Sequence, residues 1–220
     1  MSVAGRLRRW AALALCGAPL GLAACSGPSA LPAPPSAAPS TTATTVPPAQ
    51  LAALHTLLLT AADFPMGWTQ DTQAGAAGTQ GTPSCVADLV VERGSASRAN
   101  AVFVGPGKQP DAVIQTVGAF DPGTAARSVA ALRTTFDSCN GLVLDPGGTR
   151  ARVGIRPLAA PAGAGAGFAA QMTLAEGARA SYLDVFYGVR GDNATFLGWS
   201  SSSPSTGPFL DLSAAALARL

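Results

Sequence analysis

The stretch from Ser181 to Ser201, SYLDVFYGVRGDNATFLGWSS, decides the fold. From Tyr182 to Val189 both sets of alternating positions are largely apolar, which is typical of a β-strand covered on its two faces. Gly191-Asp192 supplies the residues of a tight turn, and Asn193 to Ser201 reads as the returning strand. The stretch therefore predicts two antiparallel strands within a covered sheet.

More strands are predicted upstream of this pair. Ala151 to Leu158 and Gly167 to Ala175 are bounded by turn residues, so together with the pair they form a meander. Ala101 to Val104 and Ala112 to Phe120 are rich in β-branched and aromatic residues and predict a hairpin. Val86 to Glu92 fits either a strand or a short helix.

Helical spacing of apolar residues predicts three helices. The first covers Ala49 to Ala62 and is stopped by Asp63-Phe64-Pro65. The second has Asp121 as its N-cap, Pro122 as its first residue, and runs to Cys139. The third covers Pro208 to Leu220. We therefore predict an α+β domain with a single antiparallel sheet, a meander plus a hairpin, packed with two or three helices.

The start of the chain has the layout of an export signal. Arg6, Arg8 and Arg9 precede an uncharged stretch from Trp10 to Ala24, shorter than the roughly 20 apolar residues of a spanning helix. Leu22-Ala23-Ala24-Cys25 resembles a bacterial lipobox, which implies cleavage before the cysteine and attachment of a diacylglycerol to its thiol. The alternative, an ordinary signal peptide, would leave an odd thiol in an oxidising compartment. We expect a signal peptide over residues 1–24 and a lipid anchor at Cys25, which attaches the protein to the extracytoplasmic face of the cell membrane.

The mature chain divides into a tether and one domain. Residues 26–48 are nearly all Ser, Pro, Ala and Thr and cannot bury enough surface to fold. Extended at about 3.1 Å per residue, this tether reaches up to roughly 70 Å from the membrane. Residues 49–220, about 170 residues, are enough for one domain with a hydrophobic core.

Charge argues against a nucleic-acid partner. The chain has 14 basic and 12 acidic residues, and loss of the three signal arginines changes the formal net charge from +2 to −1. Nucleic-acid-binding domains usually cluster their basic residues, whereas Lys108 is the only lysine here and the arginines are scattered.

The remaining cysteines predict one disulfide. Cys16 leaves with the signal and Cys25 takes the lipid, so the exported domain retains Cys85 and Cys139. On the chain-entropy model such a bridge stabilises the fold by about 4 kcal/mol. The rival reading, a thiol-redox pair, lacks a C-x-x-C motif.

The order of these features resembles a known family. Leu57-Leu58-Leu59, then Asp63 to Trp68, a cysteine soon after, and a strand and helix from Phe120 to Cys139 are similar to the PknH-like extracellular sensor domains of actinobacteria. The LpqN-like lipoproteins form a second similar group. The resemblance implies an α+β fold and a groove for an envelope ligand. It departs in one respect, since the kinase sensors have two disulfides and this chain has cysteines for one.

No residue pattern identifies a reaction, a metal site or a cofactor. His55 is the only histidine and lies among apolar residues, and no G-x-S-x-G motif is present. No His and Cys set offers a zinc site, and Glu92 and Glu176 are the only glutamates. The glycine run from Gly163 to Gly167 reads as a flexible turn, because no strand-helix unit surrounds it. We expect a non-catalytic domain.

Aromatic residues on the last two strands either fill the core or line a groove for a lipid or glycan. Phe186, Tyr187, Phe196 and Trp199 fall on these neighbouring strands, and a low aromatic content favours the core. The candidate ligand contacts are Trp68, Arg156, Arg190 and Trp199. The chain is expected to bind an envelope ligand or partner; a lipid carrier, marked by a large apolar cavity, and a cell-wall enzyme are the rivals.

Overall fold

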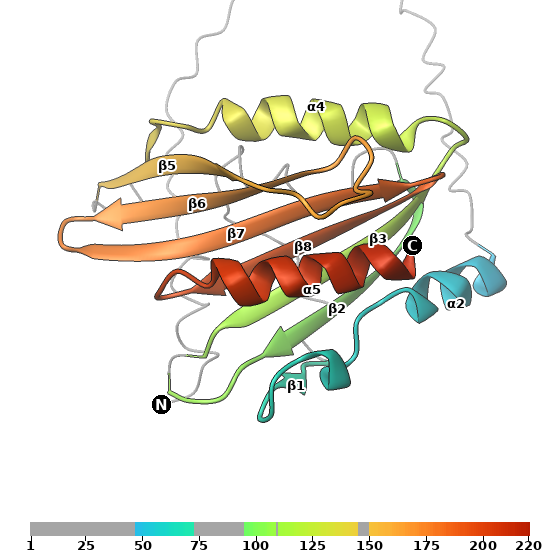
Figure 1. The fold of residues 1–220 in the computed structure, drawn as a ribbon, viewed down its shortest axis with the longest axis horizontal. Coiled ribbons are helices and arrows are strands. Elements are labelled where there is room, and N and C mark those ends of the chain that lie inside the picture. The colour runs from blue at the N-terminus through green and yellow to red at the C-terminus, as the bar shows by residue number, and fades with distance from the viewer. Residues whose placement is uncertain (1–46, 73–94, 109, 145–149) are drawn as a thin grey trace, which may run out of the picture.

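The computed structural model of the chain describes residues 47–72, 95–108, 110–144 and 150–220. Within these residues the protein forms one eight-stranded sheet and three α-helices (Figure 1). Every pair of neighbouring strands is antiparallel. The predicted α+β fold with a single antiparallel sheet is confirmed.

The sheet has the order β1-β2-β3-β8-β7-β6-β5-β4. Its strands are β1 (Thr69–Gln70), β2 (Ser95–Val104), β3 (Ala112–Phe120), β4 (Val143–Leu144), β5 (Ala151–Leu158), β6 (Phe168–Glu176), β7 (Arg179–Arg190) and β8 (Asn193–Ser201). The predicted hairpin is β2–β3 and the predicted meander is β5 to β8, and both are confirmed. The two units join through β3 and β8, so the last strand lies in the middle of the sheet.

The β7–β8 hairpin has the register that the turn residues predict. Arg190 pairs with Asn193 beside the turn, and Tyr182 pairs with Ser201 at the far end. Gly191 has a φ of 61°, a left-handed conformation that glycine adopts without steric cost. Since β7 and β8 are central strands, their apolar character on both faces is explained by helices on both sides of the sheet.

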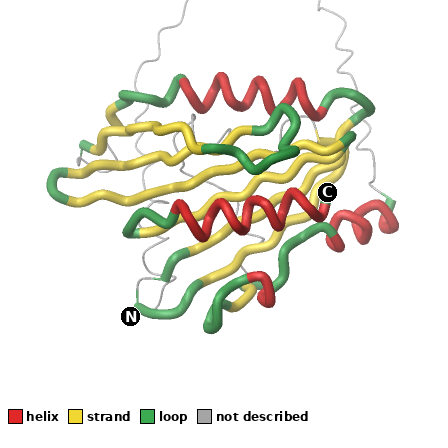
Figure 2. The backbone as a smooth tube through the Cα atoms, in the orientation of Figure 1, coloured by secondary structure: helices red, strands yellow, loops and turns green. Residues whose placement is uncertain are grey.

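Three helices cover the sheet: α2 (Pro48–Thr56), α4 (Ala125–Asp137) and α5 (Thr206–Arg219). Residues of α2 and α5 belong to one hydrophobic cluster with side chains of β2, β3, β7 and β8, and residues of α4 belong to a second cluster. The molecule therefore has three layers, with α2 and α5 on one face and α4 on the other (Figures 1 and 2). No helix among the described residues is both long and apolar enough to cross a membrane.

Helix α4 begins later than predicted. Its buried residues Ala125, Val129, Leu132 and Phe136 follow the spacing of an amphipathic helix. The N-cap is Thr124 rather than Asp121, because Gly123 has a φ of 70° and cannot continue a right-handed helix. Asp121 instead accepts a turn hydrogen bond from the N–H of Thr124 through its backbone carbonyl, at 3.0 Å.

Helix α2 is shorter than predicted, and α5 is longer at its start. The helix ends at Thr56 instead of Ala62, since Leu58 and Leu59 turn into the core and Leu59 N–H donates to the Gln115 side chain. A short 3-10 helix, η2 (Ala61–Asp63), follows. Helix α5 begins at Thr206, two residues before the predicted Pro208.

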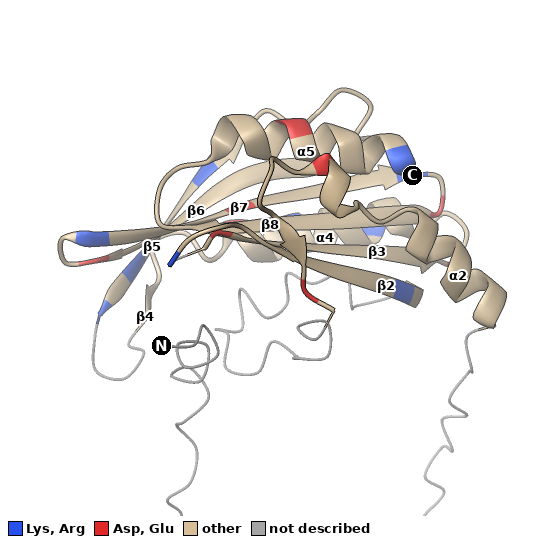
Figure 3. Cartoon of the chain, turned by 90° about the horizontal axis from the view of Figure 1, so that it is seen from below, with Lys and Arg blue, Asp and Glu red and all other residues tan. Residues whose placement is uncertain are grey.

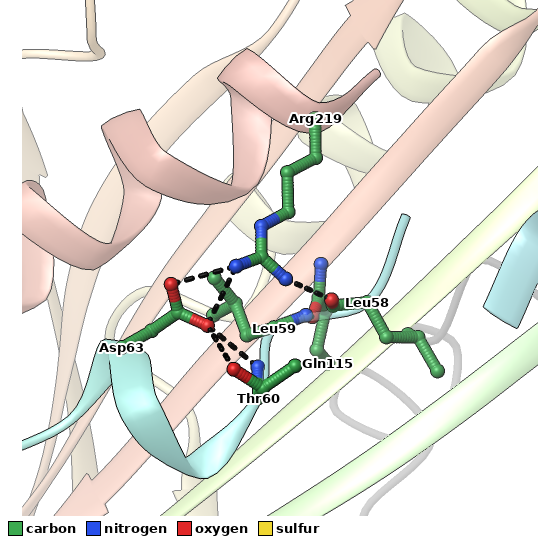
Figure 4. Close-up of polar contacts among 6 residues, drawn as sticks. All are labelled: Leu58, Leu59, Thr60, Asp63, Gln115 and Arg219. Carbon is green, nitrogen blue, oxygen red and sulfur yellow. Dashed lines mark hydrogen bonds and ion pairs between the residues drawn. The ribbon is translucent and has the colours of Figure 1, made fainter. Parts of the chain in front are cut away.

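A polar clamp connects the first and last described segments (Figure 4). Both carboxylate oxygens of Asp63, in η2, accept from Arg219 Nη2 at 2.7 Å, and Arg219 Nη1 donates to the Leu58 carbonyl. The Thr60 N–H donates to the same carboxylate at 2.6 Å. The last turn of α5 is therefore bound to the segment that follows α2.

Several predictions fall outside the described residues. These are the signal peptide, the anchor at Cys25, most of the tether, Val86 to Glu92, and Cys85. Cys139 lies in the second hydrophobic cluster with no exposed surface, just after α4. The disulfide between Cys85 and Cys139 stays a prediction.

Candidate functional site

Of the two predicted aromatic contacts, Trp199 lies in the core and Trp68 is half-buried against it. Trp199 is 4% exposed, and its ring meets Trp68 edge-on with centroids 5.3 Å apart. Trp199 Nε1 donates to Asp111 Oδ2 at 3.1 Å. Phe186, Tyr187 and Phe196 are buried as well. Of the two alternatives for these aromatics, the core is confirmed, and Trp199 offers a ligand almost no surface.

The two predicted arginines belong to different parts of the sheet. Arg156 lies on β5 and pairs in register with Gln171 of β6, which pairs with Asp184 of β7. Arg190 is exposed at the last position of β7, beside the hairpin turn. Six residues separate it from Asp184 along the strand, about 20 Å of extended chain. Only Arg156 therefore joins a side-chain cluster.

That cluster, the Asp184 network, is built around a carboxylate with no exposed surface. Asp184 Oδ1 accepts from Gln171 Nε2 at 2.8 Å, and Oδ2 accepts from Ser205 Oγ at 3.0 Å. Gln171 Nε2 also lies 3.3 Å from Thr206 Oγ1. Ser205 is the N-cap residue of α5, so the carboxylate also lies near the positive end of that helix dipole. These donors satisfy a buried carboxyl group that forms no ion pair with any basic residue in the described part of the chain.

The Asp184 network fixes the orientation of Gln171 and holds Arg156. Arg156 Nη2 donates to Gln171 Oε1 at 3.1 Å. A guanidinium can only donate and a carboxylate can only accept, so the amide oxygen of Gln171 must face Arg156 and its nitrogen must face Asp184. The arginine side chain is exposed, while the groups that hold it are buried.

An open strip of sheet lies beside the Asp184 network, on the α5 side. Alternation along each strand puts Arg152 and Gly154 on the same face as Arg156, and Gly154 pairs with Thr173, which pairs with Tyr182. Helix α5 lies over β7 and β8 and does not extend over this end of β5 and β6 (Figure 1). The open strip therefore consists of the five residues Arg152, Gly154, Arg156, Thr173 and Tyr182.

At Gly154, in the middle of the open strip, no side chain covers the backbone of the sheet. A Cβ built at Gly154 would meet no atom within 4 Å, and its φ is not in the left-handed region. Neither packing nor backbone conformation requires glycine at this position, in contrast to Gly191. The missing side chain leaves free space between Arg152 and Arg156.

Two other features that bear on chemistry are His55 and a small hollow beside α2. His55 is exposed on α2, and the described residues contain no group of three His, Cys, Asp or Glu side chains that could hold a metal. A hollow of about 260 Å³ lies between α2 and β2, lined by Leu51, Ser95, Ala96, Ser97 and Arg98. This volume is below the roughly 300–1,000 Å³ of most small-molecule sites.

The Asp184 network was not predicted, although Arg156 was. Gln171 and Asp184 are polar residues within otherwise apolar strands, and that is the signal that points to a buried polar contact. Their pairing depends on the register of three strands, which no local pattern gives. Ser205 and Thr206 reach the Asp184 network only because α5 folds back over β7.

Comparison with known proteins supports the fold and little else. No family model matches the chain, and no curated protein matches its sequence. Among solved structures it is similar to the extracellular domain of PknH from Mycobacterium tuberculosis, with a TM-score of 0.54 and 12% sequence identity. The match covers 77% of this chain and 95% of that domain. The resemblance to PknH-like sensor domains is thus confirmed at the level of the fold, and the chain shares the architecture of a kinase extracellular domain.

Proposed function

We propose that the chain is a lipid-anchored protein of the extracytoplasmic face of the cell membrane, whose α+β domain binds an envelope ligand in a sensor-like, non-catalytic role. The observation that carries the binding proposal is the open strip over β5 to β7. There an exposed arginine is held in place by a buried carboxylate and amide. An exposed arginine that is already oriented suits contact with a ligand, because less side-chain entropy is lost on binding.

Two independent features support the location. The charged and apolar segments before Cys25 have the layout of an export signal with a lipobox. The fold is also shared with a domain that is extracellular in its own protein. Replacement of Cys25 by Ala should move the protein from the membrane fraction to the soluble fraction, with loss of the lipid mass from the intact protein. A mature wild-type protein without added lipid mass would contradict the anchor.

Filling the open strip tests the ligand-binding role. Gly154→Trp places a large side chain in the middle of the open strip, where an added Cβ meets no neighbour, so the fold should be preserved. Ser181→Trp is the matched control, because Ser181 is exposed on β7 of the same sheet but alternation puts it on the opposite face.

The readout is thermal unfolding of the full chain in detergent, with and without a hydrophilic extract of the producing cell's envelope. A ligand that binds only the folded state raises the Tm. We expect this increase for the wild type and for Ser181→Trp, and its loss for Gly154→Trp. An equal increase for both tryptophan variants, or none for the wild type at any extract concentration, would contradict binding at the open strip.

A further inference from the structure

We infer that the ligand of the open strip is an acidic saccharide, a hydroxyl-rich chain that carries carboxylate or phosphate groups. This inference rests on the proposed function and names the chemical class of the ligand. It follows from the charges at the two ends of the open strip, from the way Arg156 is held, and from the residues between the arginines.

The exposed charges of the open strip are both positive. Arg152 and Arg156 lie on the same strand four residues apart, a separation of about 13 Å. Neither forms an ion pair with any residue that the structure describes, and basic positions on β5 are visible in Figure 3. The only carboxylate in the Asp184 network is buried and bonded to Gln171 and Ser205, so it is not available to a ligand. The open strip is thus complementary to negative charge.

Arg156 is prepared for an anion before the ligand arrives. One guanidinium nitrogen donates to Gln171, and the other N–H groups of the fork have no hydrogen-bond partner among the residues that the structure describes. Arginine forms bidentate, charge-assisted hydrogen bonds with carboxylates and phosphates. Because Gln171 is itself fixed by Asp184, binding costs less side-chain entropy than it would for an unrestrained arginine.

The residues between the arginines favour a saccharide over an acidic peptide. Thr173 offers a hydroxyl, Tyr182 offers a half-buried ring, and Gly154 leaves the backbone uncovered. Extended peptides usually bind by adding a strand to a sheet edge and placing side chains in pockets. The open strip is a face of the sheet, and it combines hydroxyl, aromatic and cationic groups without an apolar pocket. Such a surface suits the alternating polar and apolar surfaces of a sugar ring.

The test uses three probes of matched length: hexagalacturonate, the uncharged maltohexaose, and hexaglutamate. Binding to the full chain in detergent is measured by calorimetry at low salt. We expect hexagalacturonate to bind, maltohexaose to bind at least tenfold more weakly, about 1.4 kcal/mol or more, and hexaglutamate to bind more weakly than hexagalacturonate. An oligosaccharide of the same length with phosphate groups then separates the two sources of the anion.

Two variants that each remove one positive charge distinguish binding at the open strip from nonspecific electrostatic attraction to the whole protein. Arg156→Gln should weaken hexagalacturonate binding about tenfold, the loss expected for a bidentate contact. Arg127→Gln removes the same charge from an exposed position on α4, on the other side of the sheet, and should leave the affinity within about twofold because salt screens distant charges.

Three results would overturn the inference. These are equal losses in the two glutamine variants, equal binding of acidic and uncharged oligosaccharides, and stronger binding of hexaglutamate. If none of the acidic probes binds while the envelope extract still protects the wild type but not Gly154→Trp, the proposed ligand-binding role stands and the ligand class is wrong.

Discussion

Among single residues, Asp63 shows how its surroundings determine a pKa. Burial of its carboxyl raises the pKa, but hydrogen bonds from the Thr60 N–H and hydroxyl and the charge of Arg219 outweigh this and lower it below the ordinary value. A lowered pKa in the folded state means that the stabilisation is complete above the unfolded pKa of about 3.9 and is lost as the pH falls through the folded pKa. The clamp between Asp63 and Arg219 is therefore intact at neutral pH.

Asp63→Asn should lower the free energy of unfolding by about 1–2 kcal/mol at pH 7, because Arg219 loses a charged, partly buried partner. The difference from the wild type should shrink as the pH falls below about 4. Urea denaturation over this pH range measures both effects. Asp137→Asn is the control, since its ion pair with Arg133 is exposed and 3.8 Å long, and a change of more than about 0.5 kcal/mol there would be unexpected. A pH-independent difference for Asp63→Asn would contradict the explanation.

Tyr187 presents the opposite case, a polar atom without a partner. Its ring stacks on Phe168 with centroids 4.8 Å apart, and its buried hydroxyl has no hydrogen-bond partner in the described part of the chain. Burial raises the pKa of Tyr187 well above the ordinary value of about 10, so the phenol is neutral at any physiological pH.

Tyr187→Phe removes the unpartnered oxygen and keeps the ring. We expect the free energy of unfolding to rise by about 1 kcal/mol, since a buried group without a hydrogen bond costs stability. Tyr182→Phe, at a half-buried position, should change it by less than about 0.5 kcal/mol. Chemical denaturation of the two variants is the measurement, and a clear loss of stability in Tyr187→Phe would indicate that its hydroxyl has a partner.

At the scale of elements, the loop between β5 and β6 is more tightly packed than its glycines suggest. The sequence predicts a flexible turn from Gly163 to Gly167. Instead, Ala164 is buried in the hydrophobic cluster that contains residues of α2 and α5, and its carbonyl accepts from the Val189 N–H at 3.2 Å. A Cβ at Gly167 would collide with the backbone oxygen of Tyr187 and lie 2.8 Å from that of Ala164. The glycine is there to let the loop approach β7.

Gly167→Ala should therefore destabilise the fold by about 3 kcal/mol, because backbone atoms cannot rotate away as side-chain ends can. Gly154→Ala makes the same change where the added methyl group meets nothing, and it should be neutral within about 0.5 kcal/mol. Thermal or urea unfolding compares the two. Similar stabilities for both variants would mean that the loop between β5 and β6 moves to make room for the added methyl group.

Local patterns predicted the elements better than their ends or their contacts. The period-two pattern of β7 and the turn residues that bound the neighbouring segments were enough to find every strand of the meander. The start of α4 was wrong since Asp121-Pro122 has the chemistry of a helix start, while the conformation of Gly123 is decided by its surroundings; its N–H donates to Asp192 at 2.8 Å. Likewise Arg156 could be chosen as a candidate because an arginine is visible in the sequence. The hydrogen bonds that connect Arg156 to Asp184 through Gln171 could not be predicted, because they depend on the register of the strands.

At the scale of the whole molecule, the predicted disulfide between Cys85 and Cys139 can be tested directly. Non-reduced protein, unfolded in denaturant and treated with iodoacetamide, should leave Cys85 and Cys139 unmodified, as measured by peptide mass spectrometry. Reduction should then lower the free energy of unfolding by up to about 4 kcal/mol. Alkylation of both residues without reduction would contradict the bridge.

The clamp between η2 and α5 has a consequence for how the domain responds to pulling. If the domain is attached to the membrane as proposed, tension applied at Pro47 reaches α2 first and then the segment at Leu58 to Asp63. Helix α2 buries only Leu54, so we expect it to detach before the rest of the fold. Beyond it the load passes to the Asp63–Arg219 pair and through it to α5, at whose start Ser205 donates to Asp184 and Thr206 lies beside Gln171. A stretched tether is thus mechanically connected, along one helix, to the groups that hold Arg156.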